Sequence, residues 1–284
     1  MVLESLINPF KAERDPWELF FIGFMYNTVA IFLSLWVFSK YASLVMVFLT
    51  VLACTPLMYS TMRIEEKKDV EMEGEKTLLR EHARALAFLM LMFLGVTLSV
   101  AMWYIVLPAK TASPLFTIQT ETISSINSNI TGLISINHLS VLTKIFLNNV
   151  KVLIFCILFA FIYGMGAIFI LIWNASVIGV AIGNFFRTHF AQYATAAGLV
   201  KIAGYFHIGG LSLARYIIHG APEILAYFVG GLAGGIISVA IINHDFGTKN
   251  FEKILLDSSD LIIISVSMLF MASLLEVFVT PIFF

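Results

Sequence analysis

Six apolar segments of roughly 20 residues are the feature that most constrains how this chain can fold. In order, they cover residues 17–39, 42–60, 85–107, 150–173, 218–242 and 261–280. A helix needs about 20 consecutive apolar residues to cross the hydrocarbon core of a bilayer. Only 12% of the residues are charged, against about 25% in a soluble domain. The sequence therefore predicts an all-α polytopic membrane protein with six transmembrane helices.

Polar breaks divide the chain into three predicted parts. Residues 1–61 form an N-terminal cytoplasmic segment and a two-helix membrane hairpin, which turns at Lys40-Tyr41. Residues 62–84 hold the main charge cluster, in which Glu often precedes Lys or Arg by three or four positions. This spacing favours a solvated connector helix, with a surface for docking a partner as the alternative. Residues 85–284 form a four-span membrane domain.

The distribution of Lys and Arg predicts how the protein is oriented. Basic residues concentrate in cytoplasmic loops, and the connector at 62–84 is rich in them. With six spans, we expect a protein of the cytoplasmic (cell) membrane with both termini in the cytoplasm. Residues 109–147 are polar, and we expect short helices or loop on the outer face. They include one N-glycosylation sequon at Asn129.

The stretch 175–216 is too broken to read as an ordinary span. Asn174 interrupts the fourth apolar segment, and the apolar run after it, 175–186, has only about a dozen residues. Residues 188–216 mix polar and apolar side chains. Such segments are tolerated at membrane depth where they are buried in protein or line a wet cavity. We expect re-entrant or interfacial helices here.

The segment 218–242 carries polar groups that a simple membrane anchor does not need. Its entrance reads H-G-A-P-E, from His219 to Glu223. Glycine, proline and then a carboxylate suit a helix start, since the carboxylate meets the positive end of the helix dipole. An ionisable group inside the bilayer costs a few kcal/mol or more and often marks function. Either Glu223 caps the helix and pairs with His219, Arg215 or an asparagine, or it takes part in ion, proton or polar-substrate passage.

The predicted polar intramembrane site combines this entrance with asparagines that bracket the fourth segment. Its members are His219, Gly220, Glu223, Asn148, Asn149, Asn174 and Arg215. Asparagines at these positions can cap helices or satisfy free carbonyls. We expect the break at 174–183 to pack against 218–242 and form the polar centre. Glu276, late in the last span, is expected at the interface or paired with a basic residue.

Glycines four residues apart predict close helix packing, because small side chains let two helices approach. The pairs are Gly179 with Gly183, Gly230 with Gly234, and Gly231 with Gly235.

Several classes of function are not indicated by the sequence. No serine stands in a G-x-S-x-G context and no metal ligands are spaced together, so we expect no catalytic site, cofactor or metal. Cys54 and Cys156 lie in apolar segments and are expected to be core residues. The net charge of −1 gives no basic field for nucleic acid. The expected partners are the lipid bilayer and either further copies of the chain or other membrane proteins.

Short motifs in the second half resemble the stage II sporulation protein M family of integral membrane proteins. They are N-N-V-K at 148–151, W-N-A-S-V-I-G at 173–179 and H-G-A-P-E with the following glycines at 219–235. The sequence departs from the family pattern at Ile218, where proline is frequent, and at Ala175, where glycine is usual. The resemblance covers roughly the last two hundred residues, so the first hairpin looks like an addition, of a kind expected in an archaeal member.

This resemblance implies a non-enzymatic membrane scaffold or assembly protein. The alternative is a transporter or channel for ions or a small polar solute, which would use the Glu223 and His219 site.

Overall fold

The computed structural model describes residues 17–71, 75–131, 138–163, 167–190, 198–242 and 247–283. Within these ranges the chain is helical and contains no strand. The helices are α3 (Trp17–Val37), η1 (Ser39–Tyr41), α4 (Ala42–Glu71), α5 (Glu75–Val106), α6 (Ala109–Leu115), α7 (Thr117–Thr131), α8 (His138–Tyr163), α9 (Ala167–Phe190), α10 (Gly198–Ile242), α11 (Lys249–Leu274), the π-helix η3 (Leu275–Val279) and α12 (Thr280–Phe283). This confirms an all-α polytopic membrane protein.

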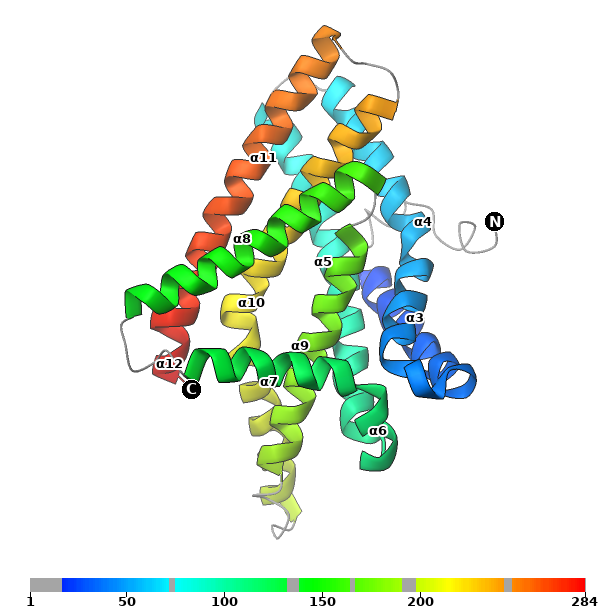
Figure 1. Ribbon diagram of the computed structural model, residues 1–284, viewed down its shortest axis with the longest axis vertical. Coiled ribbons are helices and arrows are strands. Elements are labelled where there is room, and N and C mark those ends of the chain that lie inside the picture. Colours follow the sequence, from blue (N-terminus) through cyan, green and yellow to red (C-terminus); the bar gives the residue numbers. More distant parts are fainter. Residues whose placement is uncertain are drawn as a thin grey trace.

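Helix α10 lies at the centre of the bundle (Figure 1) and packs against α4, α5, α8, α9 and α11. In its most apolar stretch 83% of the residues are buried, against 22% in α8 and 28% in α3 and α11. Tyr227 and Phe228, near the middle of α10, are fully buried. The apolar segment at 218–242 is therefore the element around which the other helices are arranged, whereas α3, α8 and α11 form the periphery.

The described residues contain seven helices long and apolar enough to cross a membrane, where six were predicted. The predicted fourth span at 150–173 is wrong, because it covers the end of α8 and the beginning of α9. Residues 164–166, with two of the glycines in that segment, lie between these two helices. Apolar residues continue on both sides of the boundary, so hydropathy alone did not reveal it.

The predicted re-entrant helices at 175–216 are also wrong. Helix α9 continues through Asn174 to Phe190, and α10 is one helix of 45 residues that begins at Gly198. Asn174 does not break α9, since its side-chain amide donates to the carbonyl of Ile170 at 2.8 Å, one turn earlier in the same helix. Pro222 likewise lies inside α10 and does not start a helix.

Two further expectations change with these boundaries. The charged residues at 62–84 do not form a separate connector helix but belong to the end of α4 and the beginning of α5, with 72–74 outside the described residues. The prediction of two cytoplasmic termini depended on six crossings, whereas seven crossings would place the termini on opposite sides of the membrane. The first hairpin, with its turn at 38–41, is as predicted.

Short helices α6 and α7 follow α5, as expected for the polar segment after the third span, although its last part belongs to α8. Helix α7 lies across the bundle, roughly perpendicular to α5 (Figure 1). Its Gln119 is fully buried. The Gln119 side chain accepts from the Ser43 hydroxyl at 2.7 Å and donates to Ser176 Oγ at 3.3 Å. One side chain thus ties α7 to both α4 and α9. The side chain of Asn129 lies outside the described residues.

The first hairpin is joined to α5 by an unusually close backbone contact. A Cβ at Gly23 would overlap the carbonyl oxygen of Met92, and a Cβ at Gly95 would overlap the carbonyl oxygen of Phe20. Each helix therefore places a glycine against the backbone of the other. Beside this contact, buried Asn27 donates to Ser99 Oγ at 3.0 Å. The hairpin is held against α5 as part of one packed body.

We expect Gly95→Ala to lower the free energy of unfolding by about 1–3 kcal/mol, the range for overpacking a well-packed site. The added methyl group meets backbone on α3, which is unable to rotate away as a side chain would. The measurement is thermal and denaturant unfolding in detergent micelles. Gly210→Ala is the matched control, because a Cβ there meets nothing within 4 Å. Equal stability of the two variants would contradict the interlocked contact.

Candidate functional site

Three polar side chains line one face of α10 where it meets the C-terminal helices. His219, Glu223 and Tyr227 follow at intervals of four residues, so they share a helix face. Tyr227 donates its hydroxyl hydrogen to Glu223 Oε1 at 2.7 Å. His219 Nδ1 lies 3.2 Å from Thr280 Oγ1 at the start of α12. The H-G-A-P-E motif thus faces the end of the chain.

The helical segment that packs against this face of α10 contains a second carboxyl group, that of Glu276. Glu276 lies in the π-helix η3, which continues α11 and packs against α10. A π-turn widens the helix by one residue and is frequent at functional sites. Glu276 lies close enough to interact electrostatically with both Glu223 and Tyr227. Within the described part of the chain, neither carboxyl group forms an ion pair with a basic residue.

The observed partner of Glu223 is one that the sequence interpretation did not name. Glu223 is hydrogen-bonded to Tyr227 and not to His219 or an asparagine, and Glu276 lies within electrostatic range of the Glu223 carboxyl group. Two ionised carboxylates at membrane depth repel each other strongly. The pair is stable when a proton or a cation reduces their mutual charge. Chemically, the site can hold a proton or a small cation.

The other members of the predicted site lie elsewhere. Asn148 is exposed on α8, and Asn149 is buried on the same helix. Asn174 bonds only within α9. Gly220 is buried on α10, but a Cβ there would meet nothing within 4 Å. The side chain of Arg215 lies outside the described residues.

The predicted glycine pairs face different neighbouring helices. Gly179 and Gly183 face α5, where a Cβ would lie 2.7 Å from the carbonyl oxygen of Thr97 and 2.8 Å from the ring of Tyr104 respectively. On α10, Gly230 and Gly234 face α8, and a Cβ at Gly234 would lie 2.6 Å from the carbonyl oxygen of Ile157. The expected polar centre between 174–183 and 218–242 is therefore not formed, although α9 and α10 do pack together.

The other predicted pair on α10 consists of Gly231 and Gly235. Gly231 turns to α9, with the Cβ of Ala167 at 3.0 Å from a Cβ placed on it. Gly235 is also buried. The glycines of α10 therefore serve two neighbours, α8 and α9.

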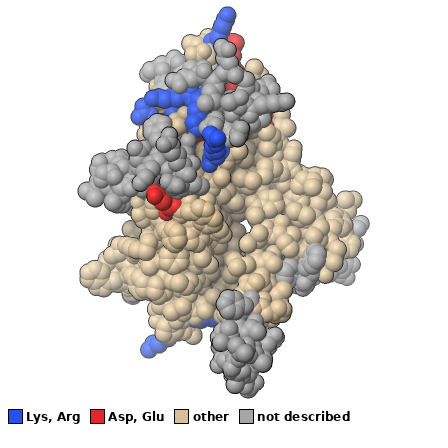
Figure 2. Space-filling model, turned by 180° about the vertical axis from the view of Figure 1, so that it is seen from behind, with Lys and Arg blue, Asp and Glu red and all other residues tan. Residues whose placement is uncertain are grey.

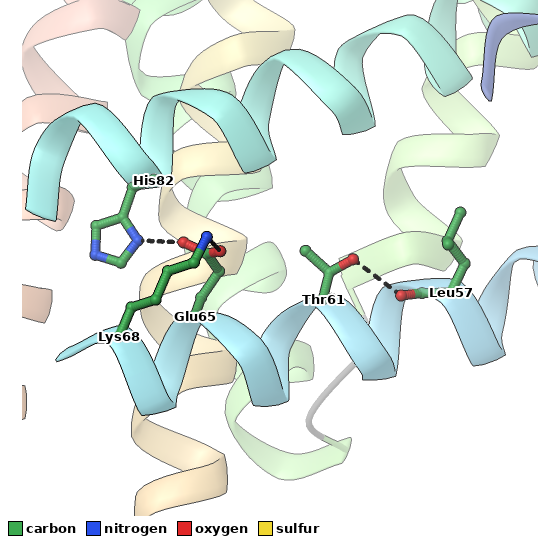
Figure 3. A network of polar contacts seen from close by, with 5 residues as sticks. All are labelled: Leu57, Thr61, Glu65, Lys68 and His82. Carbon is green, nitrogen blue, oxygen red and sulfur yellow. Dashed lines mark hydrogen bonds and ion pairs between the residues drawn. The ribbon is translucent and has the colours of Figure 1, made fainter. Parts of the chain in front are cut away.

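A second polar cluster, which the sequence interpretation missed, lies where α4 and α5 leave the apolar region (Figure 3). Glu65 is fully buried and His82 is 2% exposed. Glu65 Oε2 lies 2.7 Å from His82 Nδ1, and Glu65 Oε1 accepts from Lys68 Nζ at 2.7 Å. The Glu-x-x-Lys spacing was visible, but it suggested a solvated helix face. Only the approach of α5 buries this carboxylate and supplies the histidine.

A comparison with protein families finds that the model for Stage II sporulation protein M matches residues 85–281. The match covers more than half of the chain, from the apolar part of α5 to α12, and leaves α3 and α4 outside it. No curated protein and no solved structure matches the chain.

We expect His82→Leu to lower the free energy of unfolding by about 3 kcal/mol, because breaking a buried ion pair leaves the Glu65 charge incompletely compensated. The double variant Glu65→Leu/His82→Leu removes both groups and is expected to lie closer to the wild type. Denaturant unfolding in micelles measures both, with Lys67→Leu on the exposed face of α4 as the control. A double variant as unstable as the sum of the single changes would show that the pair is not coupled.

Proposed function

Because the chain belongs to the stage II sporulation protein M family, we propose that it is a non-enzymatic scaffold or assembly protein of the cytoplasmic membrane. The supporting observation is the interlocked packing of the central helix. A Cβ at Gly234 of α10 would lie 2.6 Å from the Ile157 carbonyl oxygen of α8, one at Gly230 would overlap the end of the Leu153 side chain, and one at Gly231 would lie 3.0 Å from the Ala167 Cβ of α9. Gly23 and Gly95 hold the first hairpin on α5 in the same way. Such contacts favour a single rigid body over one whose helices must slide.

A rigid body suits a protein that positions other proteins in a membrane. Transport by alternating access requires groups of helices to rock against each other around a central site. Here Gly234 holds α8 at backbone distance, and Gly231 packs closely against the Ala167 side chain of α9. The match to the family over residues 85–281 makes this packed domain the part in which the family role resides, with the α3–α4 hairpin as an added unit.

The proposed orientation places the charged ends of α4 and α5 in the cytoplasm, following the preference of Lys and Arg for that side. Figure 2 shows Lys and Arg gathered mainly toward one end of the molecule, with few charged side chains over the rest of the face in view. The Glu65–His82 pair joins these ends of α4 and α5 (Figure 3).

A second candidate function is the passage of protons or small cations. It is favoured by one specific observation: two carboxyl groups, those of Glu223 and Glu276, lie within electrostatic range of each other, and Tyr227 is hydrogen-bonded to the first. Ionisable groups inside a membrane protein often mark an ion or proton path. The two functions differ in what they require of these carboxyl groups, so they can be separated experimentally.

The scaffold proposal predicts stable partners that do not depend on the carboxyl pair. Affinity-tagged protein, cross-linked in its native membrane and isolated, should enrich defined membrane or envelope proteins several-fold over an unrelated polytopic bait. Glu223→Gln should retain the same partners, because it preserves the shape of the site and the acceptor for Tyr227. Recovery of no protein above the unrelated bait would contradict the proposal.

Flux through purified protein in liposomes tests the alternative directly. Under the scaffold proposal, wild type and Glu223→Gln both leave proton, Na⁺ and K⁺ fluxes at the level of protein-free liposomes. A flux in the wild type that falls at least about tenfold in both Glu223→Gln and Glu276→Gln would support passage through the site and contradict a purely structural role. Ser267→Ala on the exposed face of α11 is the matched control.

A further inference from the structure

Helix α8 carries an exposed lysine at the middle of a membrane span. The span covers His138–Ile162, and Lys151 lies at its centre with an exposed side chain. Lys144 and Asn148 are exposed on the same stripe of α8, seven and three residues before Lys151. The N-N-V-K motif thus points its asparagine Asn148 and its lysine outward, away from the core of the bundle.

A lysine side chain that faces hydrocarbon at the centre of a spanning helix is unfavourable, because its charge loses water. For this reason charged side chains in spans usually face protein or water. Among the described residues, none forms an ion pair with Lys151. Its surroundings in the membrane must therefore supply an acceptor that the single chain does not.

The neighbouring helix α11 presents the complementary charge. Asp260 is exposed and lies between exposed apolar residues of the same helix face, with Leu256 70% and Ile263 64% accessible. This segment belongs to the apolar span from Lys249 to Ile282. Asp260 also forms no ion pair within the described ranges. An unpaired acid on α11 thus accompanies an unpaired base on α8.

The two helices pack side by side at the periphery of the bundle. The rings of Phe146 and Phe270 contact each other with centroids 5.6 Å apart, and those of His138 and Phe278 with centroids 5.9 Å apart. Both helices are shown adjacent in Figure 1, on the side of α10 away from α3. They are also among the least buried spans. Lys151 and Asp260 are therefore exposed on two neighbouring helices of the periphery.

The heights of the two charges along the bundle are compatible with pairing. Gly230 of α10 meets Leu153 of α8, and a Cβ on it would lie 3.5 Å from Ser265 Oγ of α11, so Leu153 and Ser265 lie at one level. Along the bundle axis, Lys151 lies two residues to one side of the level of Leu153 and Ser265, and Asp260 lies five residues to the other side. At 1.5 Å per residue the two charges differ in height by about 10 Å, and the tilt of the helices reduces this difference. The long stem of lysine extends toward a polar partner and spans much of this distance.

We infer that the α8–α11 face binds a second copy of this chain, with Lys151 of each copy paired to Asp260 of the other. A two-fold axis along the membrane normal keeps equal residues at equal depth and makes the contact self-complementary. One face that carries both a base and an acid satisfies this requirement with two identical ion pairs. Lys144 and Asn148 extend the polar part of the contact along α8. The inference concerns assembly and does not depend on the proposed scaffold role.

The test is the dimer dissociation constant in liposomes, measured by single-molecule photobleaching or energy transfer over a series of protein-to-lipid ratios. Wild type should dimerise. Lys151→Asp and Asp260→Lys, which each bring like charges together, should raise the dissociation constant at least about tenfold. The exchanged double variant Lys151→Asp/Asp260→Lys should restore it. Lys110→Asp on α6, which is exposed elsewhere on the molecule, is the control for the charge change.

Several outcomes would overturn the inference. A monomeric wild type would show that Lys151 extends to lipid phosphate instead, and dimers unaffected by either reversal would place the contact on another face. A double variant that melts like the wild type but remains monomeric would show that the two residues are not partners. Thermal unfolding of every variant separates these results from misfolding.

Discussion

The close approach of helix backbones is the interaction on which this structure depends. Within a bilayer the hydrophobic effect does not drive one helix onto another, so association relies on packing and on interhelical hydrogen bonds. On α10, Gly234 brings α8 to backbone distance and Gly231 lets Ala167 of α9 pack closely, and α9 uses its own glycines against α5. Helix α3 repeats the device with Gly23 and Gly95. The bundle is thus a chain of glycine contacts centred on α10.

Polar groups within the bundle are arranged around this packing in two distinct ways. The neutral groups Asn27, Ser99 and Gln119 are satisfied between helices and fasten the hairpin and α7 in place. The ionisable groups divide into a hydrogen-bonded carboxyl–imidazole pair, Glu65 with His82, and two carboxyl groups within electrostatic range, Glu223 and Glu276. In the first pair each group has a hydrogen-bonding partner, whereas two ionised carboxylates in the second would repel each other. This asymmetry makes the α10–η3 contact the chemically distinctive part of the molecule.

Hydropathy and local motifs predicted much of the fold. The first hairpin, the third span with Pro108 after it, and the buried 218–242 segment were all evident from apolar length and helix signals. The boundaries between 164 and 216 were not, because Asn174 and Pro222 are read as helix breaks when considered alone. In the bundle Asn174 satisfies itself within α9, and Pro222 lies within α10. Glu223 and His219 were identified as candidates, but their partners Tyr227, Glu276 and Thr280 were not.

By itself, the sequence determined that the protein lies in a lipid bilayer, that it is helical and to which family it belongs, because apolar length and short motifs are local properties of the chain. It also determined which residues are costly to place in a bilayer. Only the tertiary structure decided which of those residues meet. Glu276 lies 53 positions after Glu223 in the chain, and His82 lies 17 positions after Glu65, on the next helix. Such pairs arise from how α10, α11, α4 and α5 pack against each other, and no spacing along one helix encodes that packing.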